Sequence, residues 1–187
     1  MVYDRRYVDN GKILTTAGLS SGIDGAFHLV SRILGRGSAQ SAALEMEYAW
    51  DPDSKWARAA LADRYLPDGL AYAKPKIKGA EAKMVSTEGG TDHWETKILV
   101  SKPSSSAEII DLLRERIASN TAAQGMFKPL SHIRGVPTLS PKRANESEIR
   151  WTFTDDQGRN WNGLGSVEGA PEARDKFVVT LKIGRAG

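Results

Sequence analysis

The side chains that could take part in acid–base or metal chemistry fall into two groups. Asp24 and His28 are four residues apart, which places them one turn apart on the same side of a helix. Asp92, His93 and Glu95 are close neighbours, but side chains alternate along a strand, so only His93 and Glu95 could share a face. Two ligands do not make a metal site, and the chain has no HExxH-type pair. We therefore expect neither a metal nor a cofactor.

A nucleophile is also missing. The chain has no cysteine, which excludes a thiolate nucleophile and disulfide bonds. No Gly-x-Ser-x-Gly elbow is present, and a serine would need a general base within hydrogen-bond reach. The histidines, His28, His93 and His132, belong to three separate segments in no recognisable triad order. Catalysis by this chain alone is therefore not expected.

The bulk composition indicates an ordinary globular protein. The chain has 187 residues, of which 40% are hydrophobic and 26% are charged. Its net charge of +3 is too small to predict nucleic-acid binding. No apolar run approaches the roughly 20 residues of a membrane span, and the polar N-terminus does not resemble a signal peptide. We expect a cytoplasmic protein that binds neither nucleic acid nor membrane.

The first third of the chain predicts a strand pair followed by helices. Asn10-Gly11 is a tight-turn signal between strands at 7–8 and 12–16. After Gly18 the pattern predicts a helix capped by Ser20 or Ser21 and ended by Gly35. Helices over 39–48 and from residue 51 onward are expected next. The apolar spacing predicts that four residues of the first helix are buried: Ile23, Phe27, Val30 and Leu34.

The rest of the chain predicts a separate α+β domain with an antiparallel sheet. A strand at 94–100 and a helix at 108–118 are followed by a hairpin, 149–153 with 159–167, and a last strand at 177–183. Trp151 and Phe153 share a face of that hairpin and are expected in its core. Gly163-Leu164-Gly165 lies inside a strand and not ahead of a helix, so it is no phosphate loop.

Residues 7–35, YVDNGKILTTAGLSSGIDGAFHLVSRILG, resemble the last strand, turn and helix of the ThiJ/PfpI family, within the class I glutamine amidotransferase-like superfamily. The similarity covers residues from about 3 to 50 and includes the end-of-domain segment Met46–Trp50. The residues of this motif that would lie near the family's site are Thr16, Ala17, Gly18, Ser20, Gly22, Ile23, Asp24 and His28.

This resemblance implies the end of a flavodoxin-like α/β domain, in which residues 12–16 would be a buried parallel strand. It gives a ThiJ/PfpI-like portion at 1–65, a linker at 66–91 and an α+β domain of no recognised family at 92–187. Family members carry their nucleophilic cysteine upstream of the matching region, and this chain begins after that point. The chain would then be a truncated remnant, a gene product whose start is placed too late, or part of a two-chain protein. If the start is placed too late, a signal peptide could lie upstream.

Two classes of function follow. The first is a ThiJ/PfpI family protein that is not catalytic alone and forms a homo-oligomer or binds a completing partner chain through exposed apolar surface of residues 12–50. The second is a module that binds a ligand or partner through its C-terminal α+β domain. A truncated gene model of a hydratase-, glyoxalase- or amidase-like enzyme is a further alternative.

Overall fold

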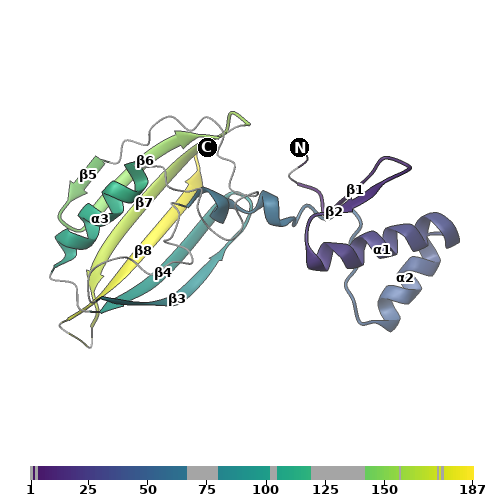
Figure 1. Cartoon of the computed structure of the whole chain (residues 1–187), viewed down its shortest axis with the longest axis horizontal. Coiled ribbons are helices and arrows are strands. Elements are labelled where there is room, and N and C mark those ends of the chain that lie inside the picture. The colour runs from purple at the N-terminus through teal and green to yellow at the C-terminus, as the bar shows by residue number, and fades with distance from the viewer. Residues whose placement is uncertain are drawn as a thin grey trace. The chain divides into compact units, whose positions relative to one another are not determined.

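The computed structural model describes residues 2, 4–66, 80–101, 105–118, 142–155, 157–171, 173 and 175–187. The chain divides into two compact units, Met1–Leu61 and Ala62–Gly187, here called the N-terminal and C-terminal units. The described residues form a mixed α/β protein with a two-stranded sheet, a six-stranded antiparallel sheet and three α-helices (Figure 1). His132 and residues 67–79 of the expected linker lie outside the described residues.

The N-terminal unit begins with the predicted hairpin. Strands β1 (Tyr7–Asp9) and β2 (Leu14–Thr16) pair antiparallel. The side-chain oxygen of Asn10 accepts hydrogen bonds from the backbone amides of Lys12 and Ile13, and Gly11 has a φ of 91°. The turn residues therefore act as the sequence predicts. The buried parallel strand expected at 12–16 is instead a half-buried to exposed strand of this antiparallel pair.

Helix α1 (Leu19–Leu34) follows directly, with Gly18 as N-cap and Gly35 at its C-terminal end. The expected cap at Ser20 or Ser21 is wrong, because Ser21 is buried inside the helix and Ser20 lies in its first turn. Phe27 is buried as predicted and Val30 is half-buried. Ile23 and Leu34 were expected inside, but they are 38% and 66% exposed.

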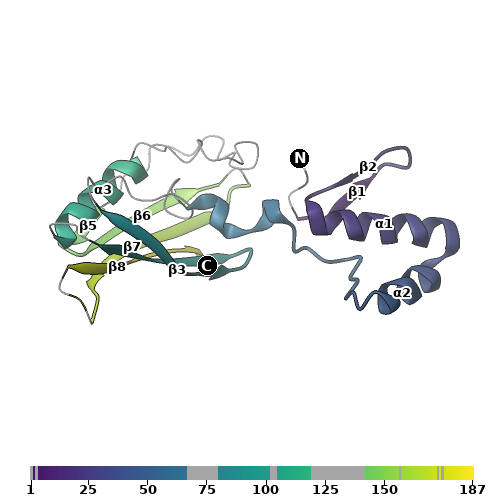
Figure 2. The ribbon, with the colours of Figure 1, turned by 60° about the horizontal axis from the view of Figure 1, so that its bottom comes forward.

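Helix α2 (Arg36–Glu45) and a 3₁₀ turn, η1 (Arg58–Ala60), complete this unit. Helix α2 begins three residues earlier than predicted, and η1 replaces the helix expected after residue 51. The hairpin lies on one side of α1 and α2 on another (Figure 2). The buried hydrophobic core of the unit is small and consists of Phe27, Ala39, Ala43 and Trp50.

The C-terminal unit is built on the six-stranded sheet, whose strand order is β3-β4-β8-β7-β6-β5. The strands are β3 (Glu81–Gly89), β4 (His93–Ser101), β5 (Lys142–Asn145), β6 (Glu148–Thr154), β7 (Asn160–Gly169) and β8 (Lys176–Arg185). Every pairing is antiparallel. The predicted strands at 94–100 and 177–183 and the predicted hairpin are all confirmed.

Helix α3 (Ser106–Ala118) and the 3₁₀ turn η2 (Ala62–Tyr65) pack against this sheet (Figure 1). The apolar spacing predicts that Ile109, Leu112, Leu113 and Ile117 are buried; Ile109, Leu113 and Ile117 are buried, together with Ile110, whereas Leu112 is half-buried. Trp151, Phe153 and Trp161 belong to the same core, which confirms the predicted core position of Trp151 and Phe153.

Two edge strands, β3 and β5, have no counterpart in the sequence analysis. Strand β3 occupies residues 81–89, within the span assigned to the linker. Its register shifts between Met84 and Ser86, so its side chains break the two-residue alternation that identifies a strand. Strand β5 is only four residues long and polar. Tyr65 and Leu66, placed in or next to the first domain from sequence, belong to the core of the C-terminal unit.

Candidate functional site

The inner side of helix α1 holds Asp24 in a closed polar cluster. Asp24 is 2% exposed. Its Oδ2 accepts a hydrogen bond from Arg6 Nε at 2.5 Å, and its Oδ1 accepts one from the Tyr48 hydroxyl at 3.1 Å. Burial and the neighbouring Asp24 carboxylate raise the pKa of Tyr48. A carboxylate that is buried and bonded on both oxygens is not presented to a substrate.

Arg6 connects this cluster to the start of α1. Besides Asp24, its guanidinium donates to Ser20 Oγ at 3.2 Å and to the carbonyl of Trp56 at 2.8 Å. The carbonyl of Arg6 accepts from the amide of Ala17 at 2.8 Å. The Arg6 side chain is 14% exposed. Arg6 therefore fixes the entry to α1, and the sequence analysis did not single it out.

His28 belongs to a second polar cluster one turn further along α1. Its Nε2 lies 2.8 Å from Asp9 Oδ2, and Arg32 Nη1 donates to the same oxygen at 2.6 Å. The ring of Tyr7 lies 4.6 Å from that of His28. A bond from the Gly11 amide, followed by those from His28 and Arg32, lowers the pKa of Asp9 to about 2. The partner of His28 is therefore Asp9 of the hairpin, and not Asp24 of its own helix.

The remaining motif residues do not join these two clusters into one site. Thr16 packs so closely on α1 that a Cβ on Gly25 would lie 2.7 Å from the Thr16 methyl, which explains that glycine. Gly22 has open space around it and Ile23 is exposed, so both belong to the opposite side of the helix. The structure brings Ser20 and Asp24 together through Arg6 and holds His28 separately.

The outer face of α1 is apolar and uncovered in the described structure. We use this name for Leu19, Gly22, Ile23, Ala26, Leu29 and Ile33, whereas Val30 packs against the core of the unit. Leu19 is 97% exposed, Leu29 42% and Ile33 76%. No charged residue interrupts the face. Amphipathic helices normally bury such a stripe, whereas here the polar stripe of Asp24, His28 and Arg32 packs against the hairpin.

The acidic–histidine group of the C-terminal unit does not form a metal site. His93 Nδ1 lies 2.7 Å from Asp92 Oδ1, and both side chains are about two-thirds exposed. Glu95 is on the outer side of the sheet, where it pairs with Lys97 and Lys182. In the part of the chain that the structure describes, no three His, Asp or Glu side chains converge on a point that could hold a metal ion.

A buried network in the C-terminal unit centres on Asp155. Its Oδ2 accepts from Tyr65 Oη at 3.1 Å, from Arg159 Nε at 2.6 Å and from Trp161 Nε1 at 3.0 Å. Its Oδ1 accepts from the amides of Gln157 and Arg159. Burial alone would raise the pKa of Asp155, but the bonds from Trp161, Arg159 and Gln157 lower it to about 2. Asp155 lies at the turn between β6 and β7, a position typical of aspartate, and its bond from Tyr65 also ties η2 to the sheet.

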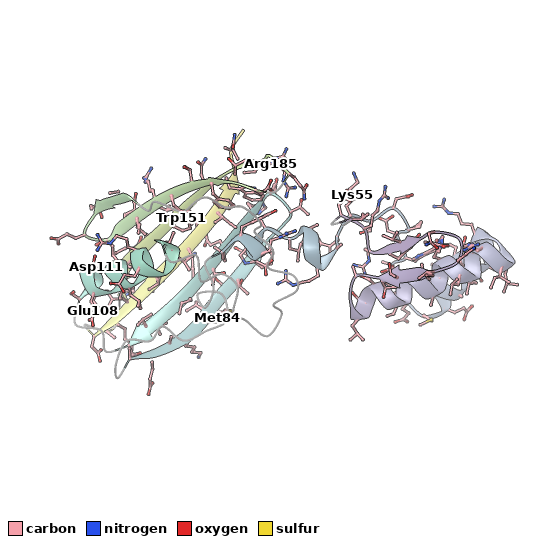
Figure 3. The ribbon with its side chains drawn as sticks, turned by 45° about the horizontal axis from the view of Figure 1, so that its top comes forward. Lys55, Met84, Glu108, Asp111, Trp151 and Arg185 are labelled. Carbon is pink, nitrogen blue, oxygen red and sulfur yellow. The ribbon has the colours of Figure 1, made fainter. Side chains whose placement is uncertain are left out.

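The glycines of Gly163-Leu164-Gly165 make room for core side chains. A Cβ on Gly163 would lie 2.0 Å from the indole of Trp151, labelled in Figure 3, and one on Gly165 would lie 2.9 Å from Ile149. Trp151 is 2% exposed and Ile149 is fully buried. These glycines thus serve core packing, as expected for glycines inside a strand.

Comparison of this chain with protein-family models, with curated proteins and with solved structures finds no match. No helix in the described part of the chain is long and apolar enough to cross a membrane. The candidate site is therefore defined by its geometry alone. Two polar clusters whose groups are hydrogen-bonded within the chain lie on the inner side of α1, and an exposed apolar stripe lies on its outer face.

Proposed function

We propose that this chain is a ThiJ/PfpI-related protein without catalysis of its own, which works as a partner-binding module through the outer face of α1. The observation that carries the proposal is the contrast between the two sides of one helix. The polar groups Asp24 and His28 have partners within the chain, while Leu19 and Ile33 have almost no cover.

The free energy available at this face is large enough for binding. Leu19, Ile23, Leu29 and Ile33 are 97%, 38%, 42% and 76% exposed. Because burying a whole Leu or Ile side chain is worth about 1.5–3 kcal/mol, covering these four would contribute roughly 4–8 kcal/mol. Contiguous apolar surface of this kind marks interaction sites on soluble proteins.

The absence of catalysis is proposed on chemical grounds. The chain has no thiol. Attack by a hydroxyl requires a general base that bonds to that hydroxyl, whereas among the described residues the histidines His28 and His93 are bonded to Asp9 and Asp92 and not to a Ser or Thr hydroxyl. Purified protein assayed with methylglyoxal and with an isonitrile should show no turnover above the buffer blank. Turnover that survives iodoacetamide would reveal a site of another kind.

Binding by the outer face is tested with a hydrophobic fluorescent dye. The wild-type chain should bind the dye, and Ile33→Glu should remove much of the signal, because a charge then replaces a 76% exposed apolar side chain at the C-terminal end of the stripe. Val85→Lys is the matched control, since Val85 is a 59% exposed apolar residue on strand β3 of the other unit. Equal dye binding by wild type and Ile33→Glu would refute the proposed face.

A further inference from the structure

Five residues of the outer face repeat with a spacing typical of a helix–helix seam. Leu19, Ile23, Ala26, Leu29 and Ile33 are separated by steps of four, three, three and four residues. Steps of three and four residues keep these side chains in one stripe along the helix. We call these five residues the α1 seam. All five side chains are exposed.

We propose that the occupant of the α1 seam is a second copy of this chain, with the two α1 helices antiparallel and Ala26 facing the same residue of the other copy. The inference rests on the proposed function, because it names the partner of that same face. It predicts an isologous contact, in which one surface pairs with itself about a two-fold axis.

The order of side chains along the seam is self-complementary about Ala26. Leu19 and Ile33 lie seven residues before and after it, and Ile23 and Leu29 lie three before and three after. A two-fold axis at Ala26 therefore sets Leu19 against Ile33 and Ile23 against Leu29. The small side chain falls where the helices approach most closely, and the large side chains fill the space toward both ends.

Electrostatics also fit a second copy better than a membrane surface. Antiparallel helices place each positive N-terminal end beside a negative C-terminal end, which is favourable. The seam itself carries no charge that two copies would bring together. A membrane surface is a poor fit, because helices that lie on membranes have a polar face rich in Lys and Arg. The polar side of α1 instead has Asp24 and His28, and its Arg32 is paired with Asp9.

The size of the seam predicts a moderate affinity. Both copies bury the same stripe, and part of the gain is offset by lost rotational and translational freedom. We therefore expect a dissociation constant on the order of 10 μM. Sedimentation of the full chain over a hundredfold concentration range should show a monomer–dimer equilibrium. Ile33→Glu should weaken dimerisation by about tenfold or more, and Val85→Lys should leave it unchanged.

Single cysteines test the register directly, because the natural chain has none. A disulfide needs Cα atoms about 4.4–6.8 Å apart. Under mild oxidation Ala26→Cys should form a covalent dimer. Leu19→Cys and Ile33→Cys should each stay monomeric alone but cross-link when mixed. Val85→Cys is the control for random collision, and circular dichroism verifies that each variant folds.

The outcomes separate this inference from the proposed function. A monomer at all concentrations that binds dye, with binding lost in Ile33→Glu, would overturn the second copy and leave the face as a site for another protein. A monomer that binds no dye would overturn both. Self-linking of Leu19→Cys and Ile33→Cys at the level of Ala26→Cys would indicate parallel helices and overturn the antiparallel register.

Discussion

The N-terminal and C-terminal units use their apolar residues in opposite ways. Among the described residues, the core of the N-terminal unit contains four buried hydrophobic side chains and that of the C-terminal unit contains seventeen. Most of the exposed large hydrophobic residues, such as Leu19 and Ile33, belong to the N-terminal unit. A small domain buries a smaller share of its surface than a large one. Small size alone, however, does not explain why the exposed apolar residues line up along one side of one helix. The described C-terminal unit covers most of its large apolar side chains itself, whereas the N-terminal unit leaves a stripe of them exposed, on which the proposed binding face rests.

The strongest test of this comparison is to remove η2 and most of strand β3 from the C-terminal unit. Residues 62–187 alone should unfold cooperatively in urea, because Tyr65 and Leu66 and all six strands are retained. Residues 88–187 should show no cooperative transition, since β4 loses most of its β3 partner and Asp155 loses Tyr65. A cooperative transition in the shorter fragment would show that η2 and β3 are dispensable.

The next largest effect is expected at Asp155. Asp155→Asn removes the charge that Arg159 and Trp161 bond to, and should cost about 2–3 kcal/mol in the free energy of unfolding. The pKa of Asp155 is lowered from 3.8 to about 2 in the folded chain. Its contribution is therefore complete above pH 4 and is lost as the pH falls from about 4 to 2. Urea unfolding at pH 7 and pH 3 should show wild type losing more stability than Asp155→Asn between the two.

A loss of similar size is expected from the core of the N-terminal unit. Phe27 packs against Tyr48 and Trp50 with ring centroids 5.6 and 5.7 Å apart. Phe27→Ala should destabilise this unit by about 2–3 kcal/mol, at the low end for such a change because few neighbours surround the cavity. Hydrogen exchange of the α1 amides measures it, with strand β7 as the internal reference. Equal acceleration of hydrogen exchange in α1 and in β7 would show that the two units unfold together.

The smallest effect is expected at Leu44 of α2, which is 68% exposed. Leu44→Gln should change the free energy of unfolding by less than about 0.5 kcal/mol, because surface substitutions away from special contacts are nearly neutral. Thermal unfolding of the full chain measures this, and Ala43→Gln, at the fully buried neighbouring position, is the contrasting variant. A loss at Leu44 as large as at Ala43 would mean that apolar residues outside the small core are buried in solution.

The sequence predicted local structure well where one strong signal was present. The Asn10-Gly11 hairpin, α3 and the β6–β7 hairpin all follow from turn residues or regular apolar spacing. Strand β3 was missed because its register shift near Val85 disturbs the alternation and its residues are mostly polar. The apolar spacing of α1 was detected, but spacing alone does not tell which stripe of a helix is covered.

The residues that bind the polar side chains of α1 could not be predicted from the sequence, for a different reason. Asp24 and His28 were identified, yet their partners Arg6 and Asp9 come from the hairpin, 18 and 19 residues away in sequence. Such pairs depend on how the hairpin folds back on the helix, which no local pattern encodes. One signal was available: Asp24, His28 and Arg32 recur every four residues, a polar stripe opposite the apolar one. The ThiJ/PfpI relationship itself stays a prediction.

Gly11 and Gly163 differ in the substitutions that they would tolerate. At Gly11 the backbone is left-handed, with a φ of 91°, but nothing lies within 4 Å of an added Cβ. Asn or Asp could therefore replace Gly11 with little loss. At Gly163 no such backbone conformation is needed, but any side chain would run into the indole of Trp151. We therefore expect substitutions at position 11 to occur independently of other positions. Position 163, in contrast, can change only in a lineage where residue 151 has first become smaller.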